Sequence, residues 1–243
     1  AWKIHGKVTT GMSHFLFRPF MTKYTRLDRK TRHAADMYIN VLEQLGVTDV
    51  ANHGLHIETS KEWNDEVFRF YKSQGVMPRD KIIGFNIGSA VPEKRWPAER
   101  FADVADYFGN KGYKTVFFGG PMDLDMVKPV VEQMKTSPIV ATGAFKLGPL
   151  AAAMKWCDLL ITNDSGPMHV AISQGVPIVA LYGPSNPFFY GPYQAKSIVL
   201  ESMDHYEIGK SMKQVIKEGK YKGISVITEE QVIKAAETLL QES

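Results

Sequence analysis

TNDSGPMHVAISQGVPIVALYGPSNP, residues 162–187, joins two apolar runs through a polar turn and a short apolar helix pattern. Residues 159–161 are Leu-Leu-Ile, which is typical of a buried strand, and residues 169–172 continue as His-Val-Ala-Ile, which suits a helix. The turn between them, residues 163–166, is Asn-Asp-Ser-Gly. Parallel α/β folds bind their ligands where a strand gives way to a helix in this manner. The turn is therefore the first candidate site.

Apolar runs and helical patterns alternate on both sides of this stretch. Strand candidates lie at residues 82–87, 115–118, 138–141, 159–162, 178–182 and 197–200. Helix candidates lie at residues 97–111, 123–135, 149–156, 167–174 and 229–241. Near-continuous apolar strands separated by helices indicate a parallel sheet covered on both faces. The predicted fold class is α/β, a Rossmann-like parallel sheet with helices on both faces.

The region before residue 81 has a different pattern. Residues 31–45 and 61–75 are predicted to be helical, and each ends close to a glycine, Gly46 or Gly75, which suits the left-handed residue that closes many helices. These two helices are interpreted as a connector.

Composition narrows the class of protein. The chain has 243 residues, of which 44% are apolar, enough for one large core or two unequal ones. No apolar run approaches the roughly 20 residues that a membrane span needs. The single cysteine, Cys157, excludes an internal disulfide and a cysteine-cluster zinc site, so a reducing cytoplasm is the simplest location.

Positive charge is concentrated at one end of the chain. Residues 1–33 contain eight basic residues and one acid, Asp28, interleaved with Phe15, Phe17 and Phe20. Such a mixture suits anionic lipid headgroups or an acidic, lipid-bearing substrate. A solvated basic loop whose aromatic side chains pack on another part of the protein is the alternative. Nucleic acid is disfavoured as a partner because no recognised binding motif accompanies the charge.

The loop after the first strand of the sheet carries cations. NIGSAVPEKRWPAERF, residues 86–101, contains a glycine, then Lys94 and Arg95, then Trp96 and a helix that begins at Pro97. Cations and unpaired backbone N–H groups at the carboxyl end of a strand are what a phosphate requires. The alternative is an exposed basic loop in which Trp96 only packs. GxGxxG and GxxxxGK[ST] are both absent, which disfavours an NAD enzyme and a P-loop ATPase.

The next strand ends in FFGGPMDLD, residues 117–125. Gly119 and Gly120 would allow a ligand to approach the backbone closely. Asp123 and Asp125 form an Asp-x-Asp pair, but acidic residues in the first turn of a helix are favoured without any metal. We therefore predict no metal site.

The turn quoted first gives the most specific signal. The N–H groups of Ser165, Gly166, Met168 and His169 are predicted to point toward an anion, and a pyrophosphate fits this arrangement. Taken singly, Asp164 could be only a helix cap and His169 only a structural histidine. The following loop, YGPSNPFFYGPY, contains Gly183 and Pro184 and is predicted to form a wall of the same pocket, as are the two glycines of the preceding paragraph.

Three segments together carry a family resemblance. TNDSGPMHVAISQGVPIVALYGP, with EKRWPAERF and FFGGP at their spacings, closely resembles glycosyltransferase family 9, the ADP-heptose:lipopolysaccharide heptosyltransferases of Gram-negative bacteria. The resemblance is strong over residues 82–193 and weak elsewhere. It implies a GT-B fold, in which two Rossmann-like domains face each other. The predicted sheet then corresponds to the C-terminal, donor-binding half.

The resemblance implies roles for individual residues. Lys94 matches the family's lysine before the Trp-Pro pair, which implies contact with the donor phosphate. The family's Asp-Ser/Thr-Gly-x-x-His turn, which holds pyrophosphate and sugar, is matched by Asp164, Ser165, Gly166, Met168 and His169. Ser89 matches a polar loop residue near the diphosphate.

The chain departs from the family pattern at its start. In the family, an N-terminal domain with a glycine-rich loop and the aspartate thought to act as general base precedes the region matched here. We predict that residues 1–75 are the remnant of this acceptor-side domain with connector helices, and that residues 76–243 form the donor-binding domain. Because the first residue is Ala1 rather than Met, we expect a fragment or processed form that binds the donor without the base.

The implied reaction is inverting, metal-independent transfer of heptose or a related sugar from an ADP-sugar to a lipopolysaccharide core acceptor, with no cofactor. The implied partners are the nucleotide sugar and a lipid-linked oligosaccharide, in the cytoplasm or at the cytoplasmic face of the inner membrane through residues 1–33. Two alternatives stay open, namely a nucleotide-sugar 2-epimerase of GT-B type and a non-catalytic nucleotide-sugar-binding module.

Overall fold

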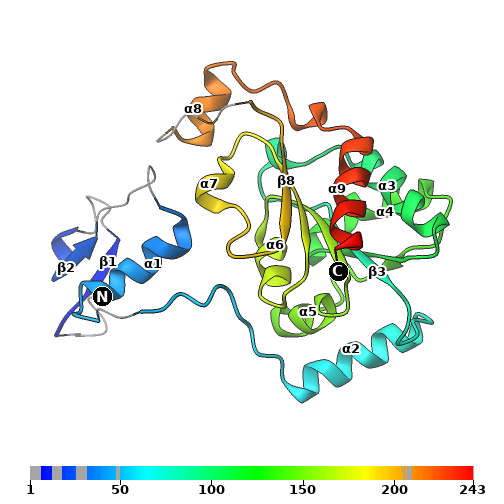
Figure 1. Ribbon diagram of the computed structural model, residues 1–243, viewed down its shortest axis with the longest axis horizontal. Helices are drawn as coiled ribbons and strands as arrows, with labels where there is room; N and C mark the ends of the chain where they lie inside the picture. The colour runs from blue at the N-terminus through cyan, green and yellow to red at the C-terminus, as the bar shows by residue number, and fades with distance from the viewer. Residues whose placement is uncertain are drawn as a thin grey trace.

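The strands between residues 82 and 201 form one parallel sheet. The computed structural model describes residues 7–12, 18–25, 32–47, 50–204, 206 and 210–242. Strands β3 (Ile82–Asn86), β4 (Lys114–Phe118), β5 (Ile139–Val140), β6 (Leu159–Asn163), β7 (Ile178–Tyr182) and β8 (Ser197–Glu201) lie in the order β5-β4-β3-β6-β7-β8 (Figure 1). Every neighbouring pair is parallel. The predicted fold class is confirmed.

The strand order reverses between β3 and β6. From β3 the chain builds outward to β4 and β5, and it then returns to place β6 on the other side of β3. Asn86, the last residue of β3, pairs with Thr162 near the end of β6. The loops that leave these two strands therefore begin side by side, at the switch point where open α/β sheets bind ligands.

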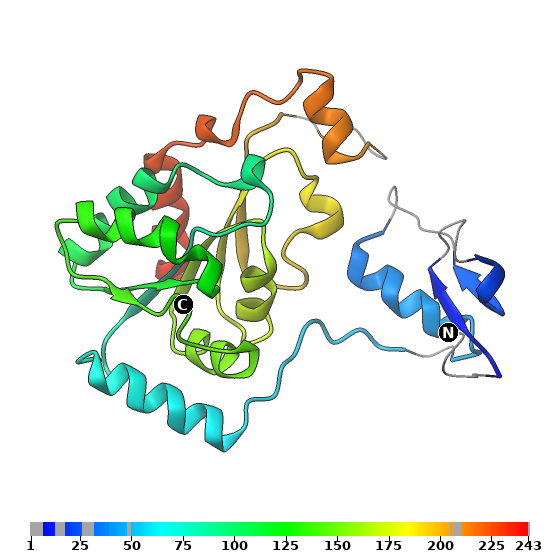
Figure 2. The ribbon, with the colours of Figure 1, turned by 180° about the vertical axis from the view of Figure 1, so that it is seen from behind.

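Helices cover both faces of the sheet (Figures 1 and 2). On one face, α3 (Ala98–Asn110), α4 (Leu124–Gln133) and α9 (Glu229–Gln241) share a core with one set of strand side chains, including Ile83 and Phe85. On the other face, α5 (Leu147–Met154) and α6 (Gly166–Ile172) share a second core with the alternate side chains, including Ile82. Two buried faces explain why β3, β6 and β7 are apolar along most of their length.

Helix α2 (Lys61–Ser73) packs with the unit that follows it. Val67 and Tyr71 are fully buried in the same core as α5, and the Tyr71 hydroxyl donates to the Ala153 carbonyl at 3.1 Å. A Cβ on Gly148 of α5 would lie 2.5 Å from the Trp63 ring, so the two helices touch closely. The sequence interpretation treated this helix as a connector. The division of the chain into two domains at residue 75 stays a prediction, but α2 itself packs in the core of the sheet domain.

The start of the chain forms a small unit that contacts the segment after β7 at Phe189 and Tyr193 (Figure 1, blue). It contains β1 (Thr10–Met12), β2 (Lys23–Thr25), which is parallel to β1, and α1 (Ala34–Glu43). Residues 50–60, which contain no helix or strand, then lead to α2. The sequence predicted α1 and α2 but neither short strand. Gly46 and Gly75 have φ of +84° and +71°, so the predicted glycine helix ends are confirmed.

The remaining short elements lie among the loops at the carboxyl edge of the sheet. They are the 3-10 turns η2 (Pro92–Lys94), η3 (Pro121–Asp123) and η4 (Ile224–Val226) and the helices α7 (Pro187–Tyr190) and α8 (Met212–Lys217); a further turn, η1 (Arg18–Phe20), belongs to the N-terminal unit. In the described ranges, every helix is too short or too polar to traverse a lipid bilayer.

Candidate functional site

A lysine and an aspartate meet where the loops after β3 and β6 converge. Lys94 Nζ lies 2.6 Å from Asp164 Oδ2. The Asp164 side chain is 6% exposed and that of Lys94 17%, so the ion pair is largely withdrawn from water. The two residues come from the two loops that the sequence identified independently. The structure therefore brings these loops together at the switch point of the sheet.

The loop that carries Lys94 is fastened to β6. Trp96, which is buried, donates its backbone N–H to Asn163 Oδ1 at 3.0 Å and its ring Nε1–H to the Ile227 carbonyl at 2.9 Å. Arg95 Nε donates back to the Ser89 carbonyl at 2.7 Å. Trp96 thus packs, as the structural alternative held, and this packing also fixes Lys94 over the turn after β6.

The Asp164 carboxylate faces the lysine rather than the helix that follows. The cap of α6 is Ser165, and no side chain caps the first turn of this helix. Asp164 Oδ2 accepts from the Ser185 hydroxyl at 2.5 Å as well as from Lys94. Its carbonyl accepts from Ser89 Oγ at 3.4 Å. The helix-cap alternative for Asp164 therefore does not describe its contacts.

The other members of the turn have different surroundings. Ser165 Oγ accepts from Asn86 Nδ2 at 2.8 Å, and Gly166 is exposed with open space where a side chain would lie. Met168 departs from the prediction, because its N–H donates to the Ser165 carbonyl at 3.2 Å and its side chain is fully buried. The Met168 side chain therefore packs in the core, and its N–H is already used within the turn and is not offered to a ligand.

His169 lies at the edge of a small apolar cavity. This cavity of about 270 Å³ is also lined by His33, the N-cap residue of α1, and by Tyr190 and Tyr193 from the segment after β7. Burial lowers the pKa of His169, the nearby Asp164 opposes this shift, and His33 and Lys94 add to it. The imidazole is therefore predominantly neutral at pH 7, so it can donate one hydrogen bond from one ring nitrogen and accept one at the other.

The glycines expected in the pocket wall differ in their surroundings. A Cβ on Gly183 would lie 2.7 Å from the Glu93 carbonyl oxygen, so the loop after β7 rests directly on the Lys94 loop. Pro184 follows in this loop and precedes Ser185. Gly119 and Gly120 lie one loop further along, where Gly120 N–H donates to Asp123 Oδ2 at 2.8 Å.

Asp123 is occupied by local structure. Besides accepting from Gly120, its carboxylate lies so close to Gly88 that a Cβ there would be 2.5 Å from it. The described ranges contain no cluster of three or more histidine, cysteine, aspartate or glutamate side chains suited to a metal ion. These contacts agree with the interpretation of Asp123 as a residue that starts a helix.

Sequence reasoning missed several polar residues of the site. Asn86 donates to Thr162 Oγ1 at 3.1 Å as well as to Ser165, and its buried Oδ1 has no hydrogen-bond partner among the described residues. Asn163 holds both sides of the switch point, because it accepts from Trp96 and donates to the Ile87 carbonyl at 2.8 Å. A polar residue that ends an apolar strand was the available signal for both asparagines.

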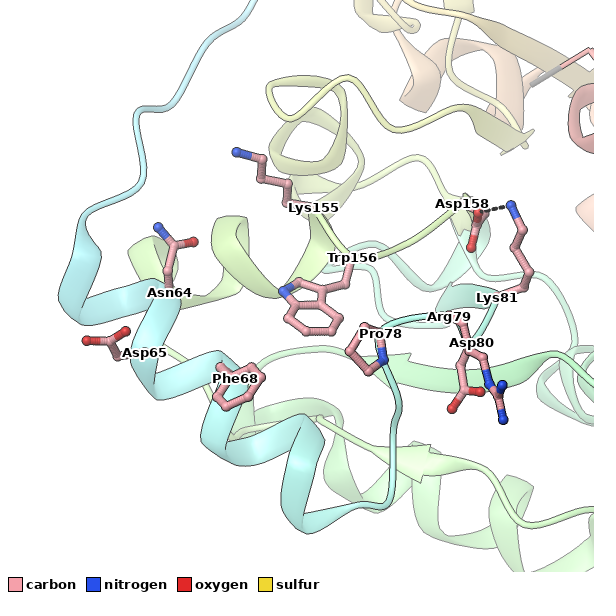
Figure 3. Close-up of a pocket in the computed structure, with 10 residues that line it drawn as sticks. All are labelled: Asn64, Asp65, Phe68, Pro78, Arg79, Asp80, Lys81, Lys155, Trp156 and Asp158. Atoms are coloured by element: carbon pink, nitrogen blue, oxygen red, sulfur yellow. Dashed lines mark hydrogen bonds and ion pairs between the residues drawn. The ribbon is translucent and has the colours of Figure 1, made fainter.

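Two depressions lie at opposite edges of the sheet. A cavity of about 220 Å³ adjoins the ion pair and is lined by Lys94, Ser185, Asn186 and Tyr190, with side chains near α8 closing its outer side. A wider cleft of about 810 Å³ lies at the amino ends of β3 and β6, between α2 and Trp156 (Figure 3). None of the predicted site residues lines this wider cleft, so we place the candidate site at the smaller cavity.

These features define the class of Rossmann-like α/β domains that carry their ligand crevice at the switch point of the sheet. The family model described as glycosyltransferase family 9 (heptosyltransferase) matches residues 3–222. The chain belongs to this family.

Known structures and proteins agree with this membership. A glycosyltransferase family 9 crystal structure from Veillonella parvula DSM 2008 is 80% identical, with a TM-score of 0.93 over the whole of this chain and 70% of that one. Lipopolysaccharide heptosyltransferase 2 of Salmonella typhimurium is 32% identical over 166 residues, which are 66% of this chain and 47% of that protein.

An Escherichia coli ADP-heptose heptosyltransferase II structure shares the fold, with a TM-score of 0.78 over 97% of this chain and 70% of that one at 24% identity. The chain spans about half the length of the curated relatives it matches first.

Proposed function

We propose that this chain forms the donor-binding part of a glycosyltransferase that transfers heptose, or a related sugar, from an ADP-sugar to a lipopolysaccharide core acceptor. The observation that carries the proposal is the Lys94–Asp164 ion pair at the switch point of a parallel sheet. Family membership supports the reaction class, and the name of the Salmonella relative supports the sugar and the acceptor.

Lys94 supplies the positive charge for the departing diphosphate. Sugar transfer builds positive character at the anomeric carbon and negative charge on the leaving group, and a fixed cation stabilises that negative charge. Lys94 comes from a loop that Trp96 and Asn163 hold in place, so the loop backbone can stay fixed while the lysine side chain turns toward the diphosphate. Removing such a contact typically costs about 2 to 4 kcal/mol of transition-state stabilisation, or roughly 30- to 1000-fold in rate.

The turn after β6 completes the donor site. Helix α6 begins at Gly166, beside Asp164, with open space where a side chain on Gly166 would lie. The first N–H groups of a helix have no acceptor within the helix, and since Pro167 has no N–H and Met168 N–H is bonded to the Ser165 carbonyl, those of Ser165 and Gly166 are the ones assigned to the donor. We assign Ser165 and Gly166 to the pyrophosphate, Asp164 to the sugar hydroxyls and to orienting Lys94, and Ser89 to the loop that faces the diphosphate. His169, kept neutral by burial, is assigned a hydrogen bond to the donor.

Metal-independent, inverting transfer is the course that the family resemblance implies, and it forms part of the proposal. Lys94 takes the place that a divalent cation holds in other transferases, and inversion requires the acceptor hydroxyl to attack the face opposite the diphosphate. In the family pattern, the general base belongs to the acceptor-side domain, so we assign no base to this chain.

We also propose that residues 1–33 contact the cytoplasmic face of the inner membrane. In the described part of this segment Val8 and Phe20 are exposed, and the Arg18 guanidinium lies 4.2 Å from the centroid of the Tyr24 ring. Several other members of the predicted basic and aromatic group lie outside the described residues, namely Lys3, Phe15, Phe17, Arg26, Arg29 and Lys30. Sedimentation should show binding to anionic vesicles that salt weakens and none to neutral vesicles.

Phosphorus NMR of the chain with ADP-heptose tests the proposed reaction class. We expect the two diphosphate resonances to shift on binding, with no consumption of the sugar nucleotide, because the sample contains no acceptor. Accumulation of an epimer would favour the 2-epimerase alternative. Unshifted resonances at millimolar ligand, with the protein folded, would remove the donor-site assignment.

A further inference from the structure

We propose that Ser185 is a positioning residue for the donor site, which holds the Asp164 carboxylate in place when Lys94 turns toward the diphosphate. Ser185 lies in the loop after β7, within the segment LYGPSNP. The inference rests on the function proposed above and adds to it a residue that acts through Asp164 rather than on the donor.

The contact that carries the proposal is a shared oxygen. Asp164 Oδ2 accepts from Ser185 Oγ at 2.5 Å and from Lys94 Nζ at 2.6 Å. A lysine that binds a diphosphate must give up part of its interaction with this carboxylate. A buried carboxylate that loses its partner is strongly destabilised unless another donor remains. Ser185 is that donor, so Asp164 keeps its orientation while Lys94 is redirected.

The loop that carries Ser185 is held rigidly against the Lys94 loop. Gly183 packs on the Glu93 carbonyl so closely that a Cβ would lie 2.7 Å from its oxygen. The Gly183 carbonyl accepts from the Tyr206 hydroxyl at 2.8 Å. Ser185 is 6% exposed, and Asn186 then caps α7 by accepting from Phe188 N–H at 2.9 Å. Anchors on both sides of Ser185 fix the direction of its hydroxyl.

Tyr182 supports the carboxylate from the interior. It is the last residue of β7 and fully buried, and its hydroxyl donates to the Tyr190 carbonyl at 2.8 Å. Burial raises the pKa of this hydroxyl, and the adjacent Asp164 carboxylate raises it further. The phenol therefore stays protonated beside the carboxylate. The phenol proton is donated to the Tyr190 carbonyl, so Ser185 is the neutral donor that the Asp164 carboxylate keeps when an anion binds.

Calorimetric titration of the full chain with ADP tests the inference through Ser185→Ala and Ser185→Thr. We expect Ser185→Ala to weaken ADP binding about 10-fold, the typical effect of one hydrogen bond to a charged group. Ser185→Thr keeps the hydroxyl and is expected to stay within about threefold of wild type. Ser202→Ala is the matched control, because Ser202 is equally buried and its Oγ has no hydrogen-bond partner among the described residues.

A second comparison separates positioning from a structural role. In an Asp164→Asn background, Ser185→Ala should cause little further loss of affinity, because the serine acts through the carboxylate. An equal loss in both backgrounds would overturn the inference, as would unchanged affinity of Ser185→Ala or equal losses for Ala and Thr. If Ser185→Ala does not fold, Ser185→Cys replaces it, because a thiol is a much weaker donor than a hydroxyl; several-fold weaker binding is expected, and unchanged binding would overturn the proposal.

ADP binding by the wild-type chain distinguishes a failure of this inference from a failure of the proposed function. Absence of ADP binding by the folded wild-type chain would overturn both. Wild-type binding together with an unaffected Ser185→Ala variant would overturn the role of Ser185 alone.

Discussion

Lys94 and Asp164 are 70 residues apart in the chain, and the ammonium of one lies 2.6 Å from the carboxylate of the other. Their contact follows from the sheet topology, because β3 and β6 are neighbours and each residue lies in the loop that follows one of these strands. A buried ion pair is an expensive way to stabilise a fold, since an apolar pair often serves as well. Its place at the switch point instead favours a role in binding.

A double-mutant cycle should reveal strong coupling within this pair. Lys94→Met and Asp164→Asn are each expected to lower the free energy of unfolding by about 2 to 4 kcal/mol, because each strands a partly buried charge or polar group. The double variant should lose less than the sum, with a coupling energy of about 1 to 3 kcal/mol in urea denaturation. Additive losses would mean that the two groups do not interact in solution.

His169 should make stability depend on pH below neutrality. Burial lowers its pKa from the ordinary value of 6.5, so the unfolded chain binds a proton more readily than the folded chain. Stability is therefore full above about pH 6.5 and is lost as the pH falls toward the lowered pKa. The melting temperature of wild type should fall between pH 7.5 and 5.5 by more than that of His169→Gln. Parallel pH profiles would count against a buried neutral histidine.

Gly183→Ala should disturb the Lys94 loop. The added Cβ would lie 2.7 Å from the Glu93 carbonyl oxygen and 3.0 Å from the Tyr221 hydroxyl, so backbone must move. Overpacking of this kind costs about 1 to 3 kcal/mol. Gly120→Ala is the matched control, because its Cβ would lie at an ordinary 3.8 Å from its neighbour, the Asp123 carboxylate. Thermal melting that ranks the two variants equally would contradict the close packing of the loops.

Tyr71→Phe tests whether α2 belongs to the sheet unit. The change removes the hydroxyl that donates to the buried Ala153 carbonyl, which keeps the Trp156 N–H at 3.2 Å, so the expected cost is that of one hydrogen bond, about 0.5 to 1.5 kcal/mol. Because α2 shares its core with α5, the midpoint of the main unfolding transition should move. If scanning calorimetry shows that only a separate, smaller transition moves, α2 does not belong to this unit.

The sequence alone predicts the parallel sheet and part of the candidate site. Six apolar runs with helices between them predict a parallel sheet, and the turn at residues 163–166 and Lys94 each carry a local signal. Ser185 and Asn86 could not be paired with their partners, because such pairs depend on strand order, which short-range patterns do not contain. Helix α2 was placed with the N-terminal segment because burial against α5 is likewise a tertiary property. Strands β1 and β2, three residues each, are too short for a periodic signal.

Calorimetric titration of the chain with ADP in the presence of EDTA tests the central claim most directly. We expect the wild-type chain to bind ADP with an affinity that EDTA leaves unchanged, because Lys94 provides the positive charge. Lys94→Ala should bind roughly 10- to 150-fold more weakly, the range expected for a lost hydrogen bond to a charged group. No binding at millimolar ADP by the folded wild-type chain, or binding that appears only with Mg²⁺ or Mn²⁺, would contradict it.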